Sequence, residues 1–216
     1  MTGQLGKRID ESHGDRDFYA FDLPAGAGGR SFLRLRVSAL PNIAMCTMLY
    51  RPGFADAVGQ YCVGRPGRDL VIPALELDPG RYLLAVVQDL DGYGGAPPYI
   101  HESISDRYTI LAESAVPDPA SEIEPNDHVG SATPVAVGKP CSATLGWAHD
   151  EDFFCLADAR APAIRWSIRA GSGESGVIEA TPIDPDSGAP RCLRVRLAAA
   201  PSGGGERYVV TALPVR

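Results

Sequence analysis

Short runs of alternating apolar and polar residues constrain this chain more than any other feature. After Asp17, the apolar residues Tyr19, Phe21 and Leu23 alternate with polar or small ones, and Phe154 and Leu156 repeat this after Asp152. The same period of two returns at Leu33-Leu35-Val37, Ile164-Trp166-Ile168 and Leu193-Val195-Leu197. Alternation of this kind is typical of half-buried β-strands, and 24 glycines and 19 prolines supply turns between them. We therefore predict an all-β fold of antiparallel, jelly-roll-like β-sandwiches.

The chain contains one structural plan twice. Gly6-Lys7 precedes Asp15-Arg16-Asp17-Phe18-Tyr19, and Gly138-Lys139 precedes Asp150-Glu151-Asp152-Phe153-Phe154. A sandwich of this type needs about 100 residues. We predict two tandem sandwiches, residues 1–114 and 122–216, which a proline-containing linker of residues 115–121 joins.

The last strand of the second sandwich has two possible counterparts. Arg207-Tyr208-Val209-Val210 could match Arg107-Tyr108-Thr109-Ile110, the last strand of the first sandwich. It could equally match Arg81-Tyr82-Leu83-Leu84, the penultimate one, which would leave the second sandwich one strand short with an open edge.

Oxygen-bearing side chains gather at two points of the second half. In the extended segment Ser121–Asp127, every second side chain points the same way, so Glu122, Glu124 and Asn126 share a face. Asp150 and Asp152 share another face at the start of an apolar strand. If the segments meet, they bring together up to six oxygen ligands, a set that suits Ca²⁺: Glu122, Glu124, Asn126, Asp127, Asp150 and Asp152. Alternatively, these are solvated acids in a turn, with Asp127 and Asp152 bound to nearby backbone donors.

The order Glu-Pro-Asn-Asp, then Gly138-Lys139, then Asp-x-Asp-Phe-Phe resembles the start of a bacterial pre-peptidase C-terminal domain. Members of that family are β-sandwich modules of secreted peptidases and other exported proteins, with the collagen-binding modules of clostridial collagenases as relatives. The resemblance implies that the acidic linker and the Asp-x-Asp pair bind calcium. It also implies an extracellular, cell-surface or periplasmic location. Residues 1–20 lack the apolar run of a signal peptide, so we expect the chain to be a fragment of a longer polypeptide.

Charge and composition narrow the classes of function. The formal net charge of −7, without runs of Lys or Arg, argues against a nucleic-acid partner. No segment approaches the roughly 18 apolar residues of a membrane helix. We predict a non-catalytic accessory module that binds an extracellular polymer or protein surface. The alternatives are a structural or assembly subunit of a cell-surface complex and, less favoured, a hydrolase with its site between the domains. The sequence localises no nucleophile–base pair for such a hydrolase.

The five cysteines include no C-x-x-C motif, which argues against a zinc ribbon or a thioredoxin-type site. Cys46 and Cys62 could bridge neighbouring strands or remain two buried thiols. Of Cys141, Cys155 and Cys192, at least one must stay unpaired within the monomer.

Overall fold

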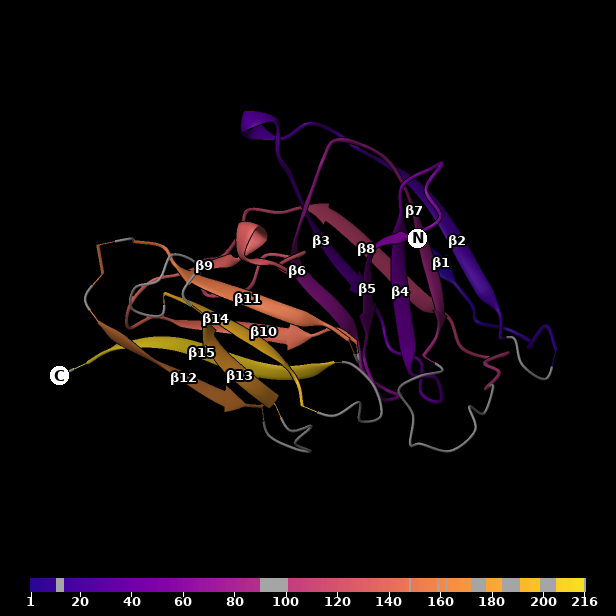
Figure 1. The fold of residues 1–216 in the computed structure, drawn as a ribbon. Helices are drawn as coiled ribbons and strands as arrows, with labels where there is room; N and C mark the ends of the chain where they lie inside the picture. The colour runs from indigo at the N-terminus through magenta and orange to yellow at the C-terminus, as the bar shows by residue number, and fades with distance from the viewer. Residues whose placement is uncertain are drawn as a thin grey trace.

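The protein has an all-β fold in a computed structural model that describes residues 1–10, 14–89, 101–147, 149–158, 160–161, 163–171, 178–183, 191–198 and 205–215. These residues form four β-sheets and two single-turn 3-10 helices (Figure 1). Within this described part of the chain, neither helix is long and apolar enough to cross a membrane. The predicted all-β class is confirmed.

The N-terminal half (residues 1–114) contains two four-stranded sheets, ordered β1-β8-β3-β6 and β2-β7-β4-β5. Their strands are β1 (Thr2–Gly3), β2 (Arg16–Leu23), β3 (Ser31–Val37), β4 (Met45–Tyr50), β5 (Ala57–Cys62), β6 (Leu70–Leu77), β7 (Gly80–Gln88) and β8 (Tyr108–Ser114), with the 3-10 helix η1 (Ala27–Gly29) between β2 and β3. The alternating apolar residues of both sheets point inward to one buried cluster, for example Leu35 of β3 and Leu84 of β7.

The C-terminal half (residues 122–216) contains a sheet β10-β15-β12 and a sheet β13-β14-β11-β9. Its elements are η2 (Val129–Ser131), β9 (Thr133–Val135), β10 (Pro140–Leu145), β11 (Glu151–Leu156), β12 (Ile164–Ala170), β13 (Ile178–Ile183), β14 (Cys192–Leu197) and β15 (Glu206–Pro214). All strand pairs are antiparallel except β9 with β11, which are parallel. A second buried cluster includes Phe154, Val195 and Tyr208.

Strand register makes the two halves equivalent. Tyr108 of β8 lies opposite Gly3 of β1, and Tyr208 of β15 lies opposite Ala143 of β10. β8 also pairs with β3, as β15 pairs with β12. The final strand therefore corresponds to β8, so the first of the two alignments left open by the sequence is right.

The described C-terminal half instead lacks counterparts of β5 and β6, and it adds β9 beyond β11. Among the described residues, β12 and β13 are therefore edge strands.

Among the strands that the sequence did not identify, β4 and β13 escaped for different reasons. In β4, Cys46 and Met45 are both buried, and Tyr50 and Met48 are half-buried, so the segment shows little alternation. β13 contains Pro182, which lacks a backbone donor and reads as a strand breaker; such a residue is tolerated because β13 is an edge strand.

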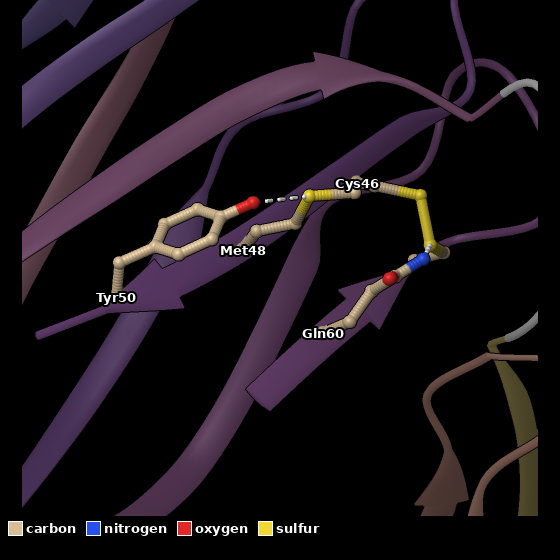
Figure 2. Close-up of a disulfide and its surroundings, with 5 residues drawn as sticks. Cys46, Met48, Tyr50 and Gln60 are labelled. Carbon is tan, nitrogen blue, oxygen red and sulfur yellow. Dashed lines mark hydrogen bonds between the residues drawn. A yellow bond between two sulfur atoms is a disulfide. The ribbon is translucent and has the colours of Figure 1, made fainter. Parts of the chain in front are cut away.

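Two disulfides each join strands directly opposite one another. Cys46 of β4 pairs with Cys62 of β5, and Cys155 of β11 pairs with Cys192 of β14. Figure 2 shows the first disulfide together with Met48 and Tyr50 of β4. The Tyr50 hydroxyl donates to the Met48 sulfur at 3.1 Å. Cys141 is the buried free thiol. Two disulfides are typical of a protein in an extracellular or otherwise oxidising environment.

The halves meet through backbone contacts and have separate buried clusters. One cluster draws on residues from Leu5 to Ile110, and the other on residues from Val135 to Ala212. Between them, Glu124 N–H donates to Ala74 O at 2.8 Å and Cys62 N–H donates to Gly146 O at 2.6 Å. The predicted boundaries of two domains at 114 and 122 stay a prediction.

Candidate metal site between the linker and β11

The acidic segment after the linker is extended, and its polar side chains point inward. Glu122, Glu124 and Asn126 are buried, whereas Ile123 and Pro125 between them are half-buried. This is the alternation that the sequence predicted. The usual burial is reversed, because the polar side chains lie inside and the apolar ones lie nearer the surface. The Glu124–Pro125 peptide bond is cis.

Three carboxylates converge at this point. One oxygen each of Glu122, Glu124 and Asp152 lies within 4.8 Å of the others. Their side chains are 2, 3 and 0% exposed. Glu122 and Glu124 come from the extended segment and Asp152 comes from β11, so the two acidic stretches of the sequence do meet.

Hydrogen bonds hold the three carboxylates in place but leave two of their oxygens without a partner. Both oxygens of Glu122 accept the Thr144 N–H, at 3.0 and 3.1 Å. One oxygen of Glu124 accepts the Asn126 N–H at 3.3 Å, and Asp152 Oδ2 accepts the Tyr208 hydroxyl. Glu124 Oε1 and Asp152 Oδ1 are buried without a hydrogen-bond partner.

Asn126 presents a further oxygen. Its Nδ2 donates to Thr133 Oγ1 at 3.3 Å, which orients the amide, and its Oδ1 is buried without a partner. Thr133 is in turn fixed because its hydroxyl donates to Ile123 O at 3.2 Å. Buried polar atoms are rarely left unpaired in native proteins, so three such oxygens, on Glu124, Asn126 and Asp152, fit a site for a cation.

The remaining two predicted residues differ from each other. Asp150 is buried, and its Oδ2 accepts the Gly146 N–H. Asp127 is exposed, and the converging group contains neither of them.

Burial and mutual repulsion act strongly on these acids. Loss of solvation, followed by the charge of Glu124, raises the pKa of Glu122 well above its usual value. Loss of solvation also raises the pKa of Glu124 and of Asp152, with Asp150 adding to both, and raises the pKa of Asp150 to about 7. Moving such charges out of water without a partner is unfavourable, and a divalent cation would reverse this.

The N-terminal half closes over the same site. Tyr61 of β5 is buried beside Gly146, where an added Cβ would lie 3.1 Å from the Tyr61 ring. A cavity of about 40 Å³ lies beside them; Glu122 and Glu124 line it together with Tyr61 and Gly146, whereas Asn126 and Asp152 do not. That volume holds an ion with one or two waters, since a water needs about 10–15 Å³ by this measure.

The equivalent acids of the N-terminal half also accept hydrogen bonds, but they are only half-buried. Asp15 accepts the N–H groups of Gly6 at 2.8 Å and Arg16 at 2.9 Å. Asp17 Oδ2 accepts the Gln4 N–H at 3.2 Å and also the Tyr108 hydroxyl. In the C-terminal half Glu122 takes the equivalent Thr144 N–H, and Asp152 is fully buried, with Oδ2 bonded to Tyr208 and Oδ1 without a partner.

Sequence reasoning missed the groups that hold the acids, namely Thr144, Tyr208, Thr133 and Tyr61. The repeat offered a signal for Tyr208, because Tyr108 and Tyr208 occupy equivalent positions near the start of the last strand of each half. No comparable signal identified Tyr61, which is distant in sequence. A second group of possible metal ligands, Cys46, Cys62 and Asp89, includes two disulfide-bonded sulfurs and thus offers no thiolate.

The described histidines lie at the surface. His128 Nδ1 contacts the Ser131 hydroxyl at 2.9 Å, but it also accepts the Ser131 N–H and so caps η2. The His149 ring contacts Trp147 edge-on, 5.1 Å between ring centres. His101 is exposed, with its backbone N–H donating to Gln88.

No protein-family model matches this chain, and no curated protein is significantly similar to it. The resemblance to pre-peptidase C-terminal domains therefore stays a prediction from the motifs alone.

Proposed function

We propose that this chain is a non-catalytic accessory or binding module of an exported protein, of the pre-peptidase C-terminal type, with a structural Ca²⁺ site. Three buried, unpartnered oxygens on Glu124, Asn126 and Asp152 support the proposal most strongly. Carboxylate and amide oxygens are the ligands that Ca²⁺ prefers. Side chains that are at most 3% exposed leave little access for a substrate, which favours a structural ion over a catalytic one.

In this proposal Glu122, Glu124, Asn126 and Asp152 hold the cation, and Asp150 contributes negative charge nearby. The ion would join the segment after the linker to β11. Glu124 also lies in a parallel bridge with Leu75 of β6, so the same residue reaches the N-terminal half. The ion would therefore stabilise the arrangement of three separate parts of the chain.

Calcium titration tests the site. Extracellular calcium modules often bind with dissociation constants of about 10⁻⁴–10⁻³ M. At a concentration tenfold above the dissociation constant, binding adds about 1.4 kcal/mol of stability, which corresponds to a rise in melting temperature of about 3–6 °C. We expect saturable heat in calorimetry and this thermal shift for the wild type, and neither for Asp152→Asn.

The repeat supplies a matched control. Asp17→Asn makes the same change at the equivalent position of the N-terminal half, and we expect it to leave the calcium response unchanged. A wild-type protein that shows no heat and no thermal shift at 10 mM CaCl₂ (about tenfold above the weakest constant expected) would exclude the calcium site.

The accessory role has its own test. We expect the purified protein to co-sediment with an insoluble extracellular polymer, in a panel of polysaccharides and fibrous proteins, without degrading it. Turnover of a peptide or ester substrate that Ser131→Ala abolishes would instead establish the hydrolase alternative.

A structural or assembly subunit is a second candidate, because β12 and β13 are unpaired edges among the described residues. Free edges can accept a partner's strand. Specific cross-linking of the protein to a cell-envelope component, with no polymer binding, would favour this role.

A further inference from the structure

One extended segment of the C-terminal half pairs with the edges of both of its sheets, first beside β10 and then beside β11. Residues 120–135, here called the lead segment, first run beside β10, where Ser142 N–H donates to Ala120 O at 2.8 Å and Glu122 N–H donates to Ser142 O at 3.0 Å. The segment then crosses to β11, where Phe153 N–H donates to Asn126 O at 3.0 Å. It ends as β9, parallel to β11.

The equivalent edges of the N-terminal half are unpaired in the described part of the chain. The register makes β1 the counterpart of β10, and the Asp-x-Asp-Phe alignment makes β2 the counterpart of β11. Among the described residues, β1 pairs with β8 alone and β2 with β7 alone. Figure 1 shows β2 at the outer margin of the molecule.

One pair of equivalent side chains, Phe153 and Phe18, differs in exposure between the two halves. Phe153, which follows Asp152 in β11, is 9% exposed where the lead segment passes. Phe18, which follows Asp17 in β2, is 61% exposed. The same outward position is therefore buried in the half whose edge strand pairs with the lead segment and exposed in the half whose described edge is unpaired.

Charge indicates what kind of segment would bind. The lead segment is acidic, with Glu122, Glu124 and Asp127. In the C-terminal half Asp127 lies near Glu151, which raises the pKa of Asp127 after the larger effect of lost solvation. The residue equivalent to Glu151 in β2 is Arg16, which is exposed between Asp15 and Asp17, so a segment there would meet one positive charge where the lead segment meets a negative one.

We propose that the β1 and β2 edges form a docking site for an extended acidic segment of another polypeptide, which lies parallel to β2 and covers Phe18 as the lead segment covers Phe153. Its first acidic side chain would accept the Gln4 N–H, as Glu122 accepts the Thr144 N–H. The Gln4 N–H, which Asp17 now accepts at 3.2 Å, would pass to the incoming side chain, and Asp17 would keep its bond from the Tyr108 hydroxyl. The site does not depend on the proposed calcium site.

A synthetic peptide tests the proposal. A fluorescein-labelled peptide with the sequence of residues 119–136 is titrated with the complete protein, and anisotropy is measured with calcium and with a chelator. We expect saturable binding that a scrambled peptide does not show. Hydrogen exchange should slow at residues 16–22 on binding, and remain unchanged at residues 151–156.

Two matched variants locate the site. Phe18→Asp should weaken binding about tenfold or more, because it removes a buried aromatic contact and adds repulsion. Phe54→Asp makes the same change at another exposed ring, 68% exposed, between β4 and β5 at the opposite edge of the same sheet, and should leave binding intact. Equal effects of the two variants would contradict the location.

Three other outcomes would overturn the proposal. Binding is absent, or equals that of the scrambled peptide. Protection appears at residues 151–156, which means that the peptide displaces the protein's own lead segment. Finally, concentrated protein without peptide dimerises with protection at residues 16–22, which assigns the edge to a second copy of this chain.

Discussion

At the scale of single residues, comparing equivalent positions of the two halves explains why a glycine occurs at position 3. Gly3 faces Tyr108 and the hydroxyl of Tyr19, and these two hydroxyls lie 2.9 Å apart. Its counterpart Ala143 lies beside a cluster in which Phe154, with no hydroxyl, replaces Tyr19. A Cβ on Gly3 would overlap both tyrosine hydroxyls, so the missing side chain at position 3 and the hydroxyl at position 19 belong together.

This pairing predicts coupled substitutions. Gly3→Ala should lower the free energy of unfolding by about 1–3 kcal/mol, the usual cost of overpacking. Tyr19→Phe alone should cost about 1 kcal/mol through its lost hydrogen bond. The double variant should be more stable than the sum of the two losses, measured by denaturant unfolding. Strict additivity would show that the Tyr19 hydroxyl is not the obstacle.

At the scale of strands, disulfides join neighbours in both halves but close loops of different length. Cys46 and Cys62 are 16 residues apart, and Cys155 and Cys192 are 37 apart. The longer loop restricts the unfolded chain more, so the loss is expected to be about 3 kcal/mol for the first bridge and about 4 kcal/mol for the second.

Denaturant unfolding measures which bridge contributes more to the free energy of unfolding. It compares two double variants, Cys46→Ala/Cys62→Ala and Cys155→Ala/Cys192→Ala. Ellman titration of the denatured protein provides the control, with one free thiol expected in each variant and in the wild type. A larger loss for the first bridge would mean that native contacts, and not loop length, set the ranking.

At the scale of the whole molecule, the acidic site lies where the linker, β11 and the N-terminal half meet. Its carboxyls have raised pKa values, so the metal-free folded state keeps protons that the unfolded chain releases above about pH 4. Each such group lowers the free energy of unfolding by about 1.4 kcal/mol per pH unit as the pH rises from there through its folded pKa.

We therefore expect the melting temperature in a chelator to fall between pH 5 and pH 8, where Asp150, with a pKa of about 7, is among the groups that titrate. With 10 mM CaCl₂ (about tenfold above the weakest constant expected) the fall should be smaller, because a cation favours the charged carboxylates. Asp150→Asn should flatten the chelator profile. An unchanged stability of the metal-free protein over this range would contradict the linkage.

Local patterns in the chain were enough to predict the fold class and the candidate acids. Period-two alternation predicted β2, β3, β11, β12 and β14, because each of these strands has one apolar face toward a core. Glu122, Glu124 and Asn126 were placed on one face for the same reason, since an extended backbone alternates regardless of which side chains point inward. These are properties of neighbours along the chain.

The rest depended on contacts between residues distant in sequence. Tertiary structure decided that Tyr208 matches Tyr108, because only strand pairing distinguishes two similar tetrapeptides. It also decided that Asp152 is fully buried beside Glu122 and Glu124 with one oxygen unpaired, whereas the equivalent Asp17 is only half-buried. Whether a carboxylate can bind an ion depends on its burial and on the groups around it, and those groups come from segments that only folding brings together.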